Sequence, residues 1–227
     1  YFPALEAGVQ TVMASFSAWN GERSHGSHYL LTEVLKNQMG FDGFVIGDWN
    51  GHALIPGCTD QSCPEAINSG VDMIMVPEDW LAFYNNTIRQ VKKGVISKER
   101  LDDAVRRILR VKMRAGLFDR GLPSEQVFAH PKAILGHAKH RSIARQAVRE
   151  SLVLLKNDKA TLPLDPKSNV LVVGSAAKDL AQQNGGWTIT WQGDKTSNAD
   201  FPGATSIYDG IAQTVQQAGG DLQYSSN

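Results

Sequence analysis

The sequence lacks several features that would mark a membrane or nucleic-acid-binding protein. Its 227 residues carry no net charge, because 23 basic side chains balance 23 acidic ones, so a nucleic acid or an anionic membrane is not expected as partner. No apolar run approaches the ~20 residues that a membrane-spanning helix needs. The first residue, Tyr1, is not methionine, and no secretory-signal pattern follows it. We therefore expect a globular chain, long enough to bury a core, whose native start lies upstream.

Cysteine is scarce. Only Cys58 and Cys63 occur, in a loop that also holds Pro56, Gly57 and Pro64. A metal site needs more ligands at a regular spacing, and none lie nearby, so we expect no metal and no other cofactor. Two free thiols and a small loop disulfide both fit this spacing. The disulfide is favoured, and it would indicate a periplasmic or extracellular location, because disulfides persist in oxidising compartments.

Short apolar strands alternate with helices in the first half of the sequence. Strands are expected at residues 11–16, 43–48 and 71–77, and helices at 28–39, 64–69, 79–93 and 97–116. This alternation predicts an α/β fold with parallel strands, and the continuous apolar strands predict a sheet covered on both faces. Three such units fit an arc of a (β/α)8 barrel or half of an open doubly wound sheet. A whole barrel takes about 250 residues, so the arc cannot close by itself.

A second unit is expected after a stretch rich in glycine and proline. Residues 119–136, with Gly121, Pro123 and Pro131, are predicted to be a linker. A helix is then expected at 137–156, a strand at 169–174, a helix at 206–217 and a strand at 221–225. The predicted division of the chain is therefore 1–118, 119–136 and 137–227.

The segment Gly47-Asp48-Trp49-Asn50-Gly51 offers the most specific chemistry. It places a carboxylate at the C-terminal tip of a buried strand, where barrel enzymes keep their catalytic groups. An enzyme that cleaves sugars needs a carboxylate to attack the anomeric carbon, and an apolar ring to stack on the pyranose face. For a lone aspartate after a strand, however, a helix cap or a turn is the more common role.

Six motifs in a fixed order favour the catalytic interpretation. They are VMASFSAWNG (12–21), GFDGFVIGDWNG (40–51), GVDMIMVP (70–77), RRILRVKMRAGLF (106–118), ESLVLLKN (150–157) and GGWTITWQG (185–193). Together they resemble the family 3 glycoside hydrolases, especially the exo-acting β-glucosidases and β-glucan glucohydrolases, over nearly the whole chain.

The resemblance implies the C-terminal part of a TIM-like (β/α)8 barrel, followed by the start of an α/β sandwich, with the active site between the two. It implies retaining hydrolysis of terminal β-D-glucosyl residues from β-glucosides or β-glucans, through a covalent glycosyl-enzyme on Asp48. Trp49 would form one wall of the leaving-group subsite and Trp191 the facing wall. Met75 would line the glucose pocket, and Trp187 would support the loop of Trp191. For Met75, Trp187 and Trp191, ordinary core packing is the alternative.

Other positions limit what the resemblance implies. Many members carry tyrosine where this chain has Phe16, which argues against a site role for Phe16. We interpret His25 and His28 as exposed surface histidines. A retaining enzyme also needs an acid/base carboxyl about 5 Å from its nucleophile, and the resemblance places that glutamate beyond Asn227. The groups that hold the glucose hydroxyls would precede the chain, so we expect residues 1–227 alone to be inactive.

Three alternatives stay open. One is an N-acetyl-β-glucosaminidase of the same family, and another is a non-catalytic sugar-binding fragment. The third is a dinucleotide-binding protein, suggested by Gly174 after the strand at 170–173, but no G-x-G-x-x-G motif follows. The expected partners are β-linked glucosides or oligosaccharides.

Overall fold

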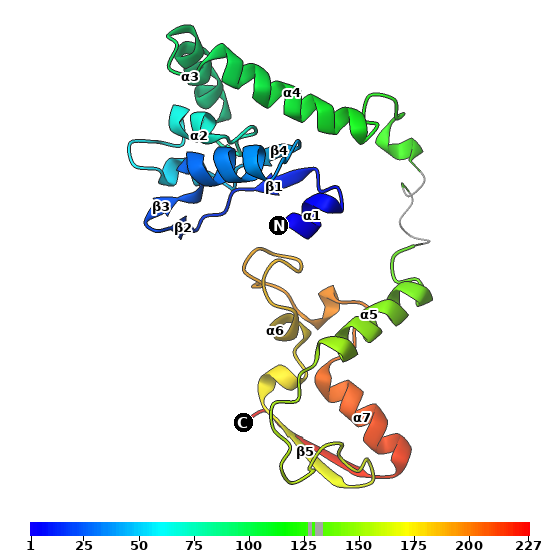
Figure 1. Cartoon of the computed structure of the whole chain (residues 1–227). Coiled ribbons are helices and arrows are strands. Elements are labelled where there is room, and N and C mark those ends of the chain that lie inside the picture. The colour runs from blue at the N-terminus through cyan, green and yellow to red at the C-terminus, as the bar shows by residue number, and fades with distance from the viewer. Residues whose placement is uncertain (127–128, 130–133) are drawn as a thin grey trace. The chain divides into compact units, whose positions relative to one another are not determined.

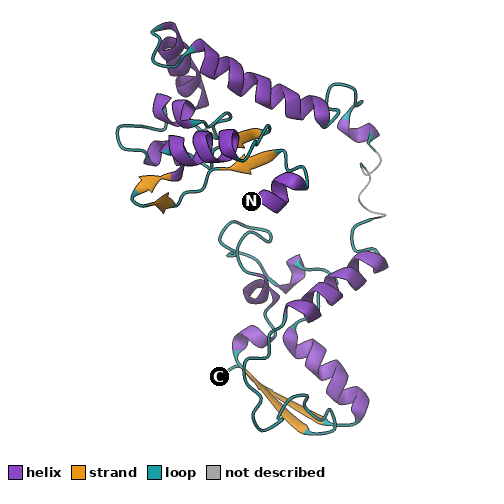
Figure 2. Ribbon diagram, viewed as in Figure 1, coloured by secondary structure: helices purple, strands orange, loops and turns teal. Residues whose placement is uncertain are grey.

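The computed structural model describes residues 1–126, 129 and 134–227, which separate into two compact units, Tyr1–Leu135 and Gly136–Asn227 (Figure 1). The predicted linker at 119–136 includes residues 127–128 and 130–133, which lie outside the described residues. Helices make up more of both units than strands do (Figure 2). Among the residues described, none of the helices has the length and apolar character to cross a bilayer.

The three predicted strands of the first unit lie side by side and parallel, as expected. Strand β1 (Thr11–Met13) pairs with β4 (Phe44–Ile46), and Ile46 forms a parallel bridge with Met73. The third segment is nevertheless a single bridge, so the prediction of a full strand at 71–77 is wrong. The reason is local, because the amide of Val45 donates to the carboxylate of Asp72 at 2.8 Å instead of to a backbone carbonyl. The amides of residues 72 and 73 both donate to the Val45 carbonyl.

Helices connect these parallel segments, as a crossover requires. Between β1 and β4 lie η1 (Ser24–Gly26) and η2 (Tyr29–Gln38), and between β4 and residue 73 lie η3 (Gly51–Leu54) and α2 (Pro64–Ser69). Helix α1 (Phe2–Glu6) precedes β1, and α3 (Trp80–Lys92), α4 (Lys98–Arg114) and the short η4 (Pro123–Glu125) follow the third segment. The helix expected at 28–39 is present but is wound as a π-helix. The predicted start of α4 is confirmed, since Ser97 Oγ accepts the amide of Arg100 at 3.0 Å.

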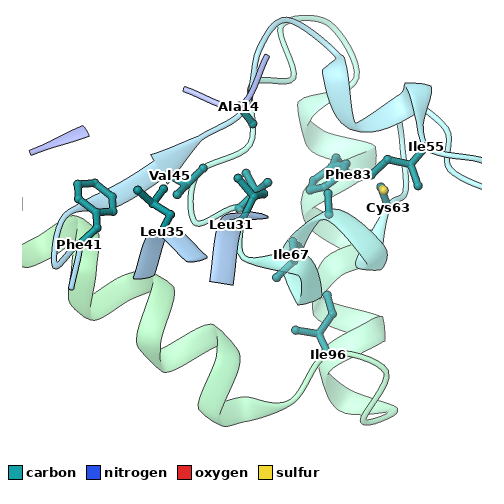
Figure 3. Close-up of a cluster of buried hydrophobic side chains, with 12 residues drawn as sticks. Ala14, Leu31, Leu35, Phe41, Val45, Ile55, Cys63, Ile67, Phe83 and Ile96 are labelled. Atoms are coloured by element: carbon teal, nitrogen blue, oxygen red, sulfur yellow. The ribbon is translucent and has the colours of Figure 1, made fainter. Parts of the chain in front are cut away.

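The core of the first unit lies where the sheet meets these helices (Figure 3). Val45, in the middle of β4, is fully buried, and Leu31 of η2, Ile67 of α2 and Phe83 of α3 belong to the same cluster. Burying one such side chain contributes about 1.5–3 kcal/mol to stability. This packing fixes the position of β4 and so the position of the residues that follow it, including Asp48.

A β-hairpin follows β1 and was not predicted. Strands β2 (Ala18–Trp19) and β3 (Glu22–Arg23) pair antiparallel across Asn20 and Gly21. Both turn residues have positive φ, 51° and 85°. Asn-Gly is the commonest sequence for this turn, so the signal was present in the sequence.

The second unit is also α/β. Its elements are α5 (Ala138–Ser151), β5 (Asn169–Val173), η6 (Ser175–Ala177), α6 (Leu180–Asn184), η7 (Asn198–Asp200), α7 (Ile207–Ala218) and β6 (Asp221–Ser225). Strands β5 and β6 pair in parallel over five residues, with α7 between them in sequence, as predicted. The helix predicted at 137–156 is too long. It ends at Ser151, because the consecutive leucines and valine that follow do not repeat with a helical period and lie exposed.

Candidate active site

Asp48 lies just beyond the C-terminal end of β4, where neighbouring segments hold the backbone. The amide of Gly47 donates to the carbonyl of Met73 at 2.8 Å, and the amide of Asn50 donates to the carbonyl of Met75 at 3.0 Å. Gly51 in turn donates to the carbonyl of Asp48 at 3.0 Å. The loop that carries Asp48 is therefore tied to the segment that ends the sheet, and is not a free surface turn.

The Asp48 carboxylate is half-buried and hydrogen-bonded on one side. Its Oδ1 accepts the amide of Trp49 at 2.7 Å. This bond holds the carboxylate against the backbone of the next residue. Partial exposure leaves the group accessible to a substrate, which a fully buried structural carboxylate would not be.

His25 contacts this loop, so its interpretation as an exposed histidine is wrong. Its side chain is only 1% exposed, and its Nε2 accepts the backbone amide of Asp48 at 2.9 Å. The short helix η1 turns the imidazole inward, where it also lies 6.4 Å from the ring of Phe16. His28, three residues further on, is exposed as expected.

The hydrogen bond defines the protonation state of His25. Because Nε2 accepts a hydrogen bond from the amide of Asp48, this nitrogen carries no hydrogen, and we assign the neutral imidazole with its hydrogen on Nδ1. Burial lowers the pKa of His25 below its ordinary value of 6.5, and the charge of His52 lowers it further, while Asp48 and the carbonyl of Ser15 oppose the change. The neutral form is therefore the dominant one at neutral pH.

Gly51 makes room for the imidazole, and Gly47 lies beside it. A Cβ atom on Gly51 would overlap the ring of His25, and a Cβ on Gly47 would lie 3.5 Å from its Cδ2 and Nε2. Between them, Asn50 has a left-handed φ of 49°. The sequence around Asp48 thus fits both a tight turn and the close approach of His25.

The other predicted site residues divide between the two units. Trp49 lies beside Asp48 and is 55% exposed. Met75 is half-buried, and its backbone carbonyl accepts the amide of Asn50. Trp187 and Trp191 belong to the second unit, where they are 83% and 69% exposed and thus are not core residues of that unit. Their loop is held by the amide of Trp187, which donates to the carbonyl of Trp191 at 3.1 Å.

Cys58 and Cys63 form a disulfide, the favoured one of the two predicted states. Their sulfurs and a carboxylate oxygen of Glu65 lie within 4.8 Å of one another. Sulfurs joined in a disulfide carry no thiolate charge and do not hold a metal as thiolates do. This group therefore offers a covalent brace for the loop and not a metal centre.

Two further features near these residues were not predicted from the sequence. His52, on η3, is buried, with its Nε2 3.1 Å from the carbonyl of Asp60 and its ring edge-on to Phe83. Trp19, on the hairpin, stacks on Tyr29 with ring centroids 5.9 Å apart, and both rings are about half exposed.

Comparisons with known proteins define the class. The family model described as "Glycosyl hydrolase family 3 N terminal domain" matches residues 1–111, and the model "Glycosyl hydrolase family 3 C-terminal domain" matches residues 152–225. The chain belongs to family 3 of the glycoside hydrolases.

Particular relatives are β-glucosidases and an exo-β-glucanase. A lysosomal beta glucosidase from Dictyostelium discoideum is 34% identical over 96% of this chain and 27% of its own length. A periplasmic beta-glucosidase from Salmonella typhimurium is 32% identical over 83% of this chain and 25% of its own. The crystal structure of an exo-1,3/1,4-beta-glucanase from a Pseudoalteromonas species has 53% identity and a TM-score of 0.91, over 98% of this chain and 28% of that one. The chain thus spans about a quarter of the length of these relatives.

Proposed function

We propose that this chain is part of a retaining enzyme that hydrolyses terminal β-D-glucosyl residues of β-glucosides or β-glucans, with Asp48 as nucleophile. One observation carries the proposal. Asp48 is an accessible carboxylate at the C-terminal end of a parallel strand, its backbone is fixed by hydrogen bonds, and the exposed ring of Trp49 follows it. Membership of family 3 and the names of the relatives support β-glucoside hydrolysis.

The proposed chemistry begins at the free side of this carboxylate. Since Oδ1 of Asp48 accepts the amide of Trp49, Oδ2 is the oxygen that we propose attacks the anomeric carbon. The attack forms a covalent glycosyl-enzyme and breaks the glycosidic bond, and water then releases glucose with its configuration retained. A second carboxyl must protonate the leaving oxygen and later deprotonate the water. We propose that this group comes from a segment other than residues 1–227.

The proposed architecture follows from the same family. The parallel arc of β1, β4 and residue 73, with its connecting helices, fits the C-terminal part of a TIM-like barrel in residues 1–118. Residues 119–136 would link it to the start of an α/β sandwich in residues 137–227. We also propose a periplasmic or extracellular location, supported by the Cys58–Cys63 disulfide and by the periplasmic relative.

A mechanism-based inhibitor tests the nucleophile directly. The full-length protein would be incubated with an activated 2-deoxy-2-fluoro-β-glucoside, which slows the second step and traps the glycosyl-enzyme. We expect one fluoroglucosyl group on the peptide that contains Asp48, found by mass spectrometry after proteolysis. A label on another carboxylate, or a product of inverted configuration in NMR, would refute the proposal.

We further propose that Trp49 and Trp191 stack on the leaving-group sugar. Losing an aromatic platform costs about 1 kcal/mol, so Trp49→Ala and Trp191→Ala should each raise KM for cellobiose or laminaribiose roughly fivefold. An aryl glucoside should be affected less, because its leaving group finds other contacts. Tyr84→Ala, which removes an exposed ring from α3, is the matched control. Unchanged disaccharide kinetics in both tryptophan variants would contradict the stacking role.

A further inference from the structure

The imidazole of His25 is a buried polar group in direct contact with the proposed nucleophile, and nothing described so far gives it a function. We propose that His25 is a positioning residue: its unprotonated Nε2 holds the backbone amide of Asp48, and the enzyme loses this support when the imidazole gains a proton. This inference rests on the proposed function, since it concerns the residue that we propose as nucleophile.

The hydrogen bond itself is the first argument. The amide of Asp48 donates to Nε2 at 2.9 Å, and the accepting ring is almost fully buried. A buried amide that loses its acceptor is left without a hydrogen-bond partner, which is unfavourable. The bond also acts directly on the nucleophile, because the amide and the carboxylate belong to the same residue.

Packing restricts the ring to this role. The imidazole lies against Gly51, where an added Cβ would overlap the ring, and beside Gly47, where an added Cβ would lie in ordinary contact with it at 3.5 Å. The ring of Phe16 lies on another side, at 6.4 Å between centroids. His25 therefore touches the loop before, at and after Asp48, and movement of the ring must move the loop or break the bond.

The charges that face His25 determine when the bond fails. Two titratable groups act on it, Asp48 from the strand tip and His52 from η3, and the backbone of Ser15 acts on it as well. Burial is the main cause that keeps the pKa of His25 below 6.5. When the pH falls through that lowered pKa, Nε2 becomes a donor and faces the Asp48 amide, which is also a donor. Stability that depends on the neutral ring is fully present above pH 6.5 and declines as the pH falls from 6.5 through the lowered pKa of His25. Activity that depends on the bond is lost as the pH falls through that lowered pKa.

Three variants of the full-length enzyme separate positioning from simple folding. His25→Phe keeps a ring and removes the acceptor, His25→Gln keeps an acceptor that does not titrate, and His28→Gln changes the exposed histidine as a control. Activity would be expressed per active site, counted by titration with the fluoroglucoside. We expect kcat per site to fall tenfold or more in His25→Phe, with KM within about twofold, while His25→Gln recovers most of it and His28→Gln is unchanged.

The pH profile gives the readout that a structural role would not alter. In the wild-type enzyme, kcat/KM should fall at low pH partly because His25 becomes protonated. Glutamine does not titrate, so in His25→Gln the part of the fall that His25 causes should be absent. Gly51→Ala, which displaces the ring without changing its chemistry, should lower kcat per site as His25→Phe does.

Each outcome decides between the two proposals. If the wild-type enzyme is not labelled at Asp48, the proposed function fails, whatever the histidine variants do. If it is labelled, but His25→Phe keeps the wild-type kcat per site, the positioning role fails. If His25→Phe does not fold, the low-pH side of the kcat/KM profile decides the question. A low-pH profile of His25→Gln identical to that of the wild type would overturn the inference.

Discussion

Replacing Asp48 with alanine in the full-length protein should lower kcat by several orders of magnitude, while the protein stays folded. The carboxylate is half-buried at the strand tip, and its accepted bond comes from the adjacent amide of Trp49. Its loss therefore removes the attacking group but no long-range contact of the core. Covalent catalysis splits a difficult step into two easier ones, and an enzyme without its nucleophile loses both.

A small external nucleophile should partly restore the reaction. Azide fits the space that the carboxylate leaves, and it should attack from the same face as Asp48 and give an α-glycosyl azide from a β-glucoside. Asp102→Ala, which removes an exposed carboxylate from α4, is the control and should keep full activity. A kcat above a tenth of the wild-type value in Asp48→Ala would contradict the assignment, and so would a β-glycosyl azide.

The place of Asp48 at the tip of a buried strand could be predicted from the sequence, because its signal is local. A continuous apolar strand, a carboxylate at its tip and a tryptophan beside it are adjacent in the chain, and the order of neighbouring motifs supported them. The parallel order of the three segments was predictable for a similar reason, since helices of sufficient length separate them. The start of the helix at residue 97 was predictable because capping depends on only four consecutive residues.

His25 could not be predicted in this way. Whether a histidine in a short turn faces solvent or the interior depends on the direction of η1 and on the space left by Gly47 and Gly51, which are more than twenty residues away. The shortened third strand has the same kind of cause. Asp72 reaches back to the amide of Val45, and an apolar pattern carries no information about that competition.

Asp72 is also the centre of a buried ionic cluster in the first unit. Its side chain is fully buried and accepts from Lys36 Nζ at 2.8 Å, from the guanidinium of Arg100 and from the amide of Val45. Lys36 is nearly as buried and also donates to the carbonyl of Gly70 at 2.7 Å. This cluster joins η2 and α4 to the sheet. Among the described residues Lys36 forms its ion pair with Asp72, whereas Arg100 pairs with both Asp72 and Asp103.

Asp72→Asn should reduce the free energy of unfolding by about 3–5 kcal/mol, because it leaves a buried cation without its counter-charge. Such a loss is a large part of the 5–15 kcal/mol typical of a folded domain. Denaturant unfolding at pH 7 would measure it. Asp42→Asn is the matched control, since Asp42 pairs with Arg114 at 2.6 Å on the exposed surface, where an ion pair contributes little. An equal loss of unfolding free energy in the two variants would show that the buried ion pairs contribute no more to stability than the exposed one.

The pH dependence of that loss should identify Lys36 as its source. Burial lowers the pKa of Lys36 from 10.5 to about 8, while Asp72 opposes the change, so removing the carboxylate must lower this pKa further. Between the variant's lowered pKa and about 8, the unfolded variant holds a proton that the folded variant has lost, and its stability rises with pH. The wild-type folded protein still holds that proton over this range, so the stability gap between wild type and Asp72→Asn should narrow as the pH rises from 6 to 8. Adding Lys36→Met to the variant should abolish this narrowing. If the stability difference between wild type and Asp72→Asn does not change with pH, the loss of stability does not come from the charge of Lys36.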